Sequence, residues 1–404
     1  MTMRIYEEQE LMKIAKRDNN TKRSYLLVNP LQGKHIPVQP SRCIHMVQEL
    51  AGKVSDTYAG ERLLLIGFAE TATAIGAIIA ENCPEVMFYM HTTREQVEGS
   101  SNFLYFSEIH SHATEQRLAT EKLDEMIRLA DRIVFAEDEV TTGNTIWNLI
   151  QCMRERYEAD SESDSERGSG GGRERKLAFG IVSVLNGMDE SNSEKFDRAG
   201  IKRLFLKKIS GRDFTAELER YDFKGEKEDF SRDMEEEKSC RKKGERIIYS
   251  APGRCEPRLG VEPVPYLKAS RNLAHFCIWL AEKEPGWDWS GKRALFLGTE
   301  EFMYPALKTA QYVEEECSCD VRFHATTRSP ILPDAEEGYP LQSRAELKSV
   351  YDGERTTYIY NLDSYDVVFL MSDTRNYTAQ GIESLTSALE AAGNSKIYIV
   401  RWSE

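Results

Sequence analysis

The sequence predicts an α/β fold: a parallel-sheet, Rossmann-like domain followed by a second α/β domain. Short apolar runs typical of buried strands alternate with segments of helical periodicity through the first half. Alternation of this kind gives a mostly parallel sheet with helices on both faces. A chain of 404 residues is long for a single core, so we expect two domains.

The strands and helices predicted for the first half of the chain alternate along the sequence. Apolar runs predict strands at 24–28, 62–66, 86–90, 133–136, 177–185 and 201–206. Apolar residues at helical spacing predict helices at Ile44, Val47, Leu50 and Ala51, at Ile75, Ile78 and Ile79, at Leu123, Met126, Ile127 and Ala130, and at Ile146, Leu149, Ile150 and Met153. Ser41 is expected to cap the first of these helices. Ligands of such sheets bind beyond the carboxyl ends of the strands.

The second half repeats part of this plan. In both halves an apolar strand ends in a glycine, and a glutamate follows three residues later. The next strand ends in Thr-Thr-Arg each time, and the strand after it carries two aspartates at the same spacing. The paired positions are Gly67 and Gly298, Glu70 and Glu301, Arg94 and Arg328, Asp131 and Asp366, and Asp138 and Asp373. We therefore expect a diverged copy of the first domain, with two unrelated α/β domains as the alternative.

Two segments have the composition of linkers. Residues 154–176 are rich in Ser, Gly and Glu with almost no apolar residue, which predicts a disordered loop. Residues 212–250 are dense in charge and offer little surface to bury, which predicts a charged linker. The expected domains are therefore 1–211 and 251–404.

Composition argues against several classes of function. A net charge of −14 is unfavourable for a general nucleic-acid binder, because phosphate backbones attract Lys and Arg. The N-terminus lacks the apolar core of a signal peptide. Glu70 interrupts the longest apolar tract, 63–80, which argues against a membrane span. Eight cysteines without a C-x-x-C pair fit a reducing compartment, so we expect a cytoplasmic protein without structural zinc.

The segment RIVFAEDEVTTGNT, 132–145, contains a small Thr/Gly loop that suits an anion. Gly143 permits a positive φ, so successive amides can converge on an anion at the N-terminus of the following helix. The hydroxyls of Thr141, Thr142 and Thr145 add further donors. This loop therefore predicts a phosphate site.

The acids Glu137 and Asp138 stand directly before that loop, and because carboxylates repel phosphate, they are expected to bind another part of the ligand. A strand ending at Ala136 would deliver Glu137 and Asp138 to the carboxyl edge of the sheet. Two carboxylates there can accept hydrogen bonds from a sugar diol and attract Mg²⁺ or a developing positive charge. A ribose with a phosphate at one end fits both features. The alternative is an ordinary strand-to-helix turn with solvated acids.

This stretch resembles the PRPP-binding motif of type I phosphoribosyltransferases. It departs from that motif at Glu137, where Asp is usual, at Glu139, where an apolar residue is common, and at Asn144, which replaces a frequent Gly. With GKHIPVQP, GFAETATAIG, HTTRE and EIHSHAT, the chain resembles the orotate-phosphoribosyltransferase-like branch associated with tellurium-resistance and stress-response genes. The carboxyl half resembles its companion TRSP domain, whose signature stands here at residues 327–330.

The resemblance implies roles for individual residues. Glu137 and Asp138 would hold the ribose diol, with Mg²⁺ bound nearby through PRPP, and Arg94 would neutralise the departing pyrophosphate. An ion pair with Glu95 is the alternative for Arg94. Two turns would bind phosphates: Thr141, Thr142, Gly143, Asn144 and Thr145 the 5-phosphate, and Gly67, Ala69, Glu70 and Thr71 the pyrophosphate.

Several of these residues keep more than one interpretation. Glu70 would bind Mg²⁺ or a substrate amine, or cap its helix. Residues 95–112 correspond to the family's mobile covering loop, and in it Glu108, His110 and His112 would contact the substrate, relay a proton, bind a metal or serve structure alone. Lys34 and His35 lie where the family recognises the base, or they form a plain hairpin turn.

The second domain lacks the paired acids and the Thr/Gly loop, so it is not expected to hold PRPP in the same way. Its candidate anion or substrate pocket consists of Gly298, Glu300, Glu301, Thr327, Arg328 and Ser329, with Arg258 as a further candidate. A second active site, a lid and a dimerisation partner remain open as its role.

The resemblance implies a Mg²⁺-dependent phosphoribosyltransferase that moves a 5-phosphoribosyl group between PRPP and a nucleobase or base-like heterocycle, in either direction. A nucleotide-like metabolite or stress-response pathway is the implied setting. The alternatives are a non-catalytic PRPP or nucleotide sensor and a hydrolase of a phosphoribosylated compound. The expected partners are PRPP, pyrophosphate, a base-like small molecule and a second copy in a homodimer, with no nucleic acid and no membrane.

Overall fold

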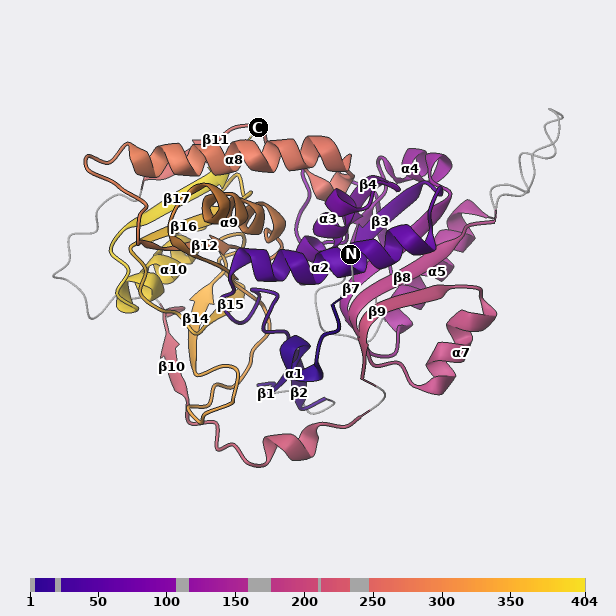
Figure 1. The fold of residues 1–404 in the computed structure, drawn as a ribbon, viewed down its shortest axis with the longest axis horizontal. Helices are drawn as coiled ribbons and strands as arrows, with labels where there is room; N and C mark the ends of the chain where they lie inside the picture. Colours follow the sequence, from indigo (N-terminus) through magenta and orange to yellow (C-terminus); the bar gives the residue numbers. More distant parts are fainter. Residues whose placement is uncertain are drawn as a thin grey trace. The chain divides into compact units, whose positions relative to one another are not determined.

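The computed structural model describes residues 4–18, 23–106, 116–158, 176–209, 212–232 and 247–403. These form two compact units. Unit 1 comprises Met1–Ile5, Val47–Arg212 and Glu256–Tyr266, and unit 2 comprises Tyr6–Met46, Asp213–Cys255 and Leu267–Glu404. Each unit is built on a five-stranded parallel sheet, so the predicted α/β fold is confirmed (Figure 1).

Unit 1 has the sheet order β4-β3-β7-β8-β9. Its strands are β3 (Leu63–Gly67), β4 (Val86–His91), β7 (Arg132–Val140), β8 (Phe179–Asn186) and β9 (Lys202–Lys208). Its helices are α3 (Ala72–Asn82), α4 (Leu123–Leu129), α5 (Asn144–Tyr157) and α7 (Glu190–Arg198), and a hairpin pairs β5 (Phe103–Tyr105) with β6 (Arg117–Ala119). The five strands of the sheet and the helices α3, α4 and α5 lie within a few residues of the predicted ones, whereas α7 and the hairpin of β5 and β6 were not predicted.

The core of unit 1 follows from the alternation of side chains along its strands. Leu64, Ile66, Ile133 and Phe135 point to one face and pack with the apolar residues of α4 and α5. The opposite face packs against α3, which contacts β3, β4 and β7. Both faces of the sheet are therefore covered, and its strand ends are left as the place for a ligand.

Unit 2 has the sheet order β11-β17-β16-β12-β13. Its strands are β11 (Ile248–Ala251), β12 (Arg293–Gly298), β13 (Asp320–Ala325), β16 (Val367–Ser372) and β17 (Ile397–Trp402). A second sheet pairs β10 (Glu226–Asp229), β14 (Ser343–Lys348) and β15 (Thr356–Tyr360). The helices that lie wholly in unit 2 are α9 (Tyr304–Glu316) and α10 (Ala379–Ala391), with short helical turns at α1 (Glu8–Leu11) and η2 (Thr215–Leu218). A further short turn, η3 (Pro257–Leu259), belongs to unit 1.

The two sheets share their topology and register, as a diverged copy requires. Strands β3, β4, β7 and β8 correspond to β12, β13, β16 and β17. Arg62 donates its amide to the Asp131 carboxylate at 2.9 Å, and Arg293 donates its amide to Asp366 at 2.8 Å in the same way. The fifth strand differs, because β9 follows the other strands of its sheet in the chain whereas β11 precedes them.

The boundaries differ from the predicted ones at the N-terminus. In unit 2, β1 (Lys13–Lys16) pairs with β2 (Tyr25–Val28), and Val38 exchanges backbone hydrogen bonds with Phe323 of β13. Residues 6–46 therefore pack with the C-terminal half. The division falls within α2 (Pro40–Thr57) and α8 (Pro263–Glu282). Ser41 does not cap α2, because its hydroxyl donates to Glu314 at 3.0 Å.

The predicted charged linker is more structured than its composition indicates. Its described residues supply β10 and β11, which are paired with β14 and β17 in unit 2. The core of the predicted disordered loop, residues 159–175, lies outside the described residues. Within the described ranges, no helix has both the length and the apolar character required to cross a membrane.

Candidate active site

The acids of unit 1 stand beyond the end of a neighbouring strand. β3 pairs with β7 as far as Gly67 opposite Ala136, while β8 continues to pair through Glu137 and Glu139. This continued pairing explains why β7 runs to Val140 instead of ending at Ala136 as predicted. Glu137, Asp138 and Glu139 are half-buried there. Successive residues of a strand face opposite sides, so a ligand reached by both Glu137 and Asp138 must lie beyond the end of β3.

The electrostatics of this edge favour a ligand with positive charge or hydroxyl donors. Burial raises the pKa of Glu137 well above its usual value, and the charges of Asp138 and Glu139 raise it further. Arg94 opposes this shift, which places the guanidinium within electrostatic reach of the carboxyl group. The predicted catalytic residues Glu137, Asp138 and Arg94 therefore belong to one edge of unit 1.

The Thr/Gly turn forms as predicted at the N-terminus of α5. Gly143 has φ 75°, and a Cβ at this position would lie 2.6 Å from Met188 and 2.8 Å from Phe196. Only glycine fits both the conformation and the space. Gly143 is also the N-cap residue and supplies no side-chain cap. The side chains of the turn are exposed, and these are Thr141, Thr142, Asn144 and Thr145.

A lysine that the sequence did not indicate lies beside this turn. Lys195 of α7 donates from Nζ to Oδ1 of Asn144 at 3.3 Å, and it stands over the ring of Trp147. An anion at the N-terminus of α5 would therefore meet a helix dipole and a nearby cation. No local pattern signals Lys195, because α7 follows β8 and approaches α5 only in the fold.

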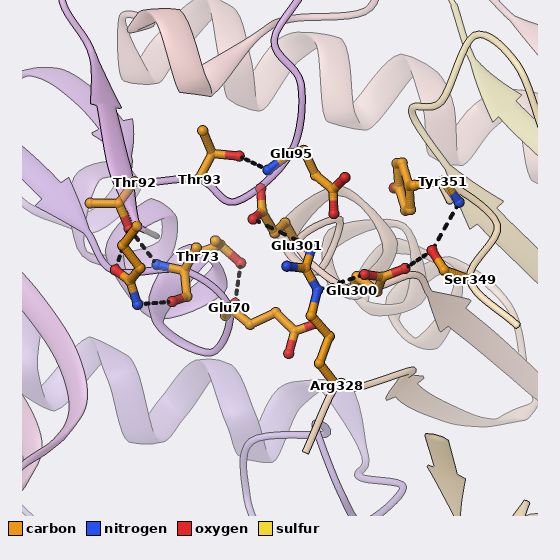
Figure 2. Close-up of polar contacts among 12 residues, drawn as sticks. Glu70, Thr73, Thr92, Thr93, Glu95, Glu300, Glu301, Arg328, Ser349 and Tyr351 are labelled. Carbon is orange, nitrogen blue, oxygen red and sulfur yellow. Dashed lines mark hydrogen bonds and ion pairs between the residues drawn. The ribbon is translucent and has the colours of Figure 1, made fainter. Parts of the chain in front are cut away.

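The turn of residues 67–71 is fixed from two sides (Figure 2). The amide of Ala69 donates to Oγ1 of Thr92 at 2.9 Å, and Nε2 of Gln116 donates to the carbonyl of Ala69 at 2.8 Å. The hydroxyl of Thr92 in turn donates to Oε1 of Gln116 at 3.1 Å. Both backbone groups of Ala69 are thus engaged within the protein.

The rest of this turn leads into α3. Gly67 has no room for a side chain, because a Cβ would lie 2.7 Å from the carbonyl of Ala72. Thr71 is the N-cap residue of α3, and its side chain makes no cap hydrogen bond. Glu70 is buried, and its carbonyl accepts the Thr73 hydroxyl at 3.1 Å. The turn therefore keeps a fixed path between β3 and α3.

The segment after Arg94 is anchored to the strand that follows the covering loop. Thr93 and Arg117 exchange backbone hydrogen bonds at 2.9 and 3.0 Å, and Arg117 donates to the carbonyl of Glu95 at 2.6 Å. These contacts hold the start of segment 95–112, which was predicted to cover the site, and β5 within that segment pairs with β6. Within it, Glu108, His110 and His112 lie outside the described residues.

Lys34 and His35 belong to unit 2. Both are buried in unit 2, where Nζ of Lys34 donates at 2.8 Å to the carbonyls of Glu300 and Thr326. Burial lowers the pKa of His35 to about 3, so its imidazole is neutral near pH 7. Both residues thus have a structural place within unit 2.

The candidate residues of the second domain do come together at the carboxyl edge of unit 2. Nε of Arg328 donates to Glu300 at 2.7 Å, and its Nη2 lies 3.9 Å from Glu301 (Figure 2). The amide of Ser329 donates to the Thr327 hydroxyl at 3.2 Å, and Gly298 ends β12 at the same edge. Arg258 belongs to unit 1, where it pairs with Glu256 at 2.9 Å.

The residues present fit a divalent cation only in combination with a ligand. In the described part of the chain, no group of three or more His, Cys, Asp or Glu side chains is arranged to hold a metal ion. Yet the crowded carboxylates at Glu137 and Asp138 would be stabilised by a cation. A Mg²⁺ ion would therefore take most of its oxygen ligands from a bound phosphorylated sugar.

Two family models match the chain. The model described as phosphoribosyl transferase matches residues 11–163, and the model described as the TRSP domain C-terminal to that transferase matches residues 256–389. No curated protein matches the chain.

Solved structures that are similar include several phosphoribosyltransferases. Adenine phosphoribosyltransferase from Rhodothermus marinus is 12% identical, with 50% of this chain and 96% of that chain covered and a TM-score of 0.33. The enzyme from Thermoanaerobacter pseudethanolicus is 11% identical over 49% and 96%, with a TM-score of 0.31. A hypoxanthine phosphoribosyltransferase from Staphylococcus aureus is 12% identical over 43% and 76%, with a TM-score of 0.23. Because these TM-scores are low, the family models carry the assignment.

Proposed function

Because residues 11–163 belong to the phosphoribosyl transferase family and residues 256–389 to its TRSP companion, we propose that unit 1 transfers a 5-phosphoribosyl group between PRPP and a nucleobase or base-like heterocycle. The observation that carries this proposal is the arrangement at β7 and α5. Three acids stand beyond the end of β3, and a glycine turn without a side-chain cap follows them. A diol and a phosphate of one ribose match these two features.

Each end of the ribose would have its own partners. The exposed side chains of the turn, the amides at the start of α5 and Lys195 would bind the 5-phosphate. Glu137 and Asp138 would accept hydrogen bonds from the two ring hydroxyls. This binding fixes the sugar with its anomeric carbon at the edge of the sheet, where the negative charge favours an oxocarbenium-like transition state.

The leaving group would lie toward the turn of residues 67–71. Arg94 follows the end of β4 and would neutralise negative charge on pyrophosphate as it departs. Gln116 acts as a positioning residue, since it holds the Ala69 carbonyl and Thr92 together. Mg²⁺ bound by PRPP and the acids would supply further charge neutralisation. A base nitrogen would form its bond to the anomeric carbon as the bond to pyrophosphate breaks.

The test is to incubate the full chain with PRPP, Mg²⁺ and a panel of purines, pyrimidines and related heterocycles while measuring pyrophosphate. Pyrophosphate that depends on one base, together with a ribosylated product, is the expected result. Pyrophosphate without any base would indicate a hydrolase. Tight PRPP binding without pyrophosphate from any base would indicate a sensor and would overturn the transferase proposal.

A further inference from the structure

One buried carboxylate organises the carboxyl edge of unit 2. Oε2 of Glu300 accepts from Nε of Arg328 at 2.7 Å and lies 3.3 Å from Nε of Arg355. Oε1 accepts the hydroxyl of Ser349 at 2.5 Å. The residue is only 1% exposed. Two guanidinium groups and a hydroxyl around one carboxylate form the kind of donor set that proteins use for carboxylate and phosphate ligands.

The backbone around Glu300 supports this position of its side chain. Glu300 has φ 50°, a left-handed conformation that few residues other than Gly and Asn adopt. Its amide donates to Oγ1 of Thr326 at 3.0 Å, and Nζ of Lys34 donates to its carbonyl at 2.8 Å. The turn between β12 and α9 is thus held from both sides, with the ammonium group of buried Lys34 at the carbonyl of Glu300.

The corresponding turn of unit 1 has a methyl group where unit 2 has this carboxylate. The amide of Ala69 donates to Thr92 as the amide of Glu300 donates to Thr326. Both acceptors stand two residues before the arginine of a Thr-Thr-Arg sequence, Arg94 in unit 1 and Arg328 in unit 2. Ala69 and Glu300 are therefore equivalent positions.

We propose that the carboxyl edge of unit 2 is an oxyanion site whose bound anion is the side chain of Glu300. The carboxylate occupies the position on Arg328 and Arg355 that a phosphate or carboxylate group of a small ligand would take. Wild-type unit 2 therefore holds no free phosphate or pyrophosphate at this edge. Removal of the carboxylate opens the site to such anions. This inference rests on the contacts of unit 2 and not on the reaction of unit 1.

The decisive variant is Glu300→Gly in the full chain. Glycine removes the carboxylate and adopts φ 50° without strain, so the path of the turn is preserved. The probe is inorganic pyrophosphate, measured by isothermal titration calorimetry and by its effect on Tm. We expect the variant to bind one more pyrophosphate per chain than the wild-type protein and to gain more in Tm from it. Because unit 1 is identical in the two proteins, any binding there cancels in the difference.

Two further variants distinguish the effect of the volume left by Glu300 from the effect of the charged groups around it. Glu300→Gln fills the same volume with a neutral amide, so we expect a lower Tm than wild type and no added pyrophosphate site. In the double variant Glu300→Gly/Arg328→Ala, the added site should disappear, because one of its two guanidinium groups is missing. Glu301→Gly is the matched control, since Glu301 lies 3.9 Å from Arg328 and should create no site.

Equal stoichiometry for Glu300→Gly and wild type would overturn the proposal, provided that far-ultraviolet circular dichroism shows both proteins folded. If Glu300→Gly does not fold, acetate in place of pyrophosphate offers the same comparison through recovery of folding. A carboxylate from solution should restore the fold of Glu300→Gly and not that of the Glu300→Gly/Arg328→Ala variant. Absence of that selective recovery would equally contradict the proposal.

Discussion

The carboxyl edges of the two sheets share the arrangement of four strands but differ in the side chains that stand there. In unit 1, Gly143 leaves the N-terminus of α5 without a side-chain cap, and Ala69 places only a methyl group in the turn after β3. In unit 2, the side chain of Thr378 caps α10 by accepting the amide of Gly381 at 3.1 Å. In the turn after β12, which is equivalent to the turn after β3, the side chain of Glu300 accepts a hydrogen bond from Arg328. Side chains of unit 2 thus stand at two places where the proposed function of unit 1 puts a ligand.

The comparison separates features that both sheet edges share from features that distinguish the proposed ligand site of unit 1. Topology, register and the Thr-Thr-Arg sequence are common to both edges, so none of them identifies where a ligand binds. The distinguishing feature is charge balance. Burial, and then the charges of Asp138 and Glu139, raise the pKa of Glu137 in unit 1 against the opposing charge of Arg94, whereas Glu300 of unit 2 is paired with two arginines.

The largest effect is expected on turnover, when the aspartates at equivalent positions of the two units, Asp138 and Asp373, are replaced. Asp138→Asn should reduce turnover by roughly a hundredfold or more with the accepted base, in line with loss of one preorganised electrostatic contact. The fold should survive, since Asp138 is at an edge and only half-buried. Steady-state kinetics and circular dichroism measure these two results.

The matched control is Asp373→Asn in unit 2. Asp373 accepts the Tyr351 hydroxyl at 2.8 Å and lies 3.8 Å from Arg254, so its loss should lower Tm. Turnover per folded molecule should stay at the wild-type value. Equal losses of turnover in the two variants would show that the edges do not act separately.

A smaller effect is expected at the uncapped helix of unit 1. Gly143→Ala should lower the free energy of unfolding by about 1–3 kcal/mol, because the methyl group meets Met188 and Phe196 and φ is positive. PRPP affinity should fall with it. Urea denaturation and calorimetry provide the measurements.

Gly60→Ala serves as the comparison within the same unit. Gly60 has φ 81°, and no atom lies within 4 Å of the place that a Cβ would take, so only the backbone cost of about 1 kcal/mol applies. PRPP affinity should not change in this variant. A similar loss of affinity in both would mean that the turn at Gly143 is not a phosphate site.

The smallest effect concerns the pH dependence of stability. Since the pKa of Glu137 is raised in the folded state, that state binds the proton more tightly than the unfolded chain. The resulting stability is present below the ordinary carboxyl pKa and is lost as pH rises through the folded pKa. Glu137→Gln should therefore show a smaller fall of Tm between about pH 5 and pH 8 than wild type, without ligand.

Two controls accompany this pH series. Glu125→Gln removes an exposed carboxyl group of α4 and should leave the slope of Tm against pH unchanged. Saturating PRPP with Mg²⁺ should reduce the difference between wild type and Glu137→Gln, because the ligand stabilises the ionised carboxylates. An unchanged slope in Glu137→Gln would exclude the proposed charge imbalance.

Local patterns were sufficient for most of the fold. Apolar periodicity located the sheet strands of unit 1 and the helices α3, α4 and α5, because burial of one face is encoded within a few neighbouring residues. It did not locate α7, which lies between β8 and β9. The Thr/Gly turn was also predictable, since a glycine after a strand and before a helix has few conformations available. The extent of β7 was not, because pairing with β8 depends on residues distant in the chain.

Long-range packing explains the remaining differences. Lys34 and His35 stand near the start of the chain, and nothing local shows that Lys34 reaches the carbonyls of Glu300 and Thr326. Gln116 and Lys195 reach the edge of unit 1 from other elements, and neither lies in a recognisable motif. The charge-rich segment before residue 250 contributes β11, whose pairing with β17 compensates for its weak local signal.

The position of β11 in the chain decides how this protein can be divided for experiments. A fragment that begins at residue 256, where the TRSP match begins, would leave out β11 and remove the edge strand next to β17. Ile399 and its neighbours would then present unpaired backbone groups, which favours aggregation. The hairpin of β1 and β2 and the Val38 pairing with Phe323 would be missing as well. Sequence-family limits are therefore poor places to cut, and expression of the intact chain is the sound starting point.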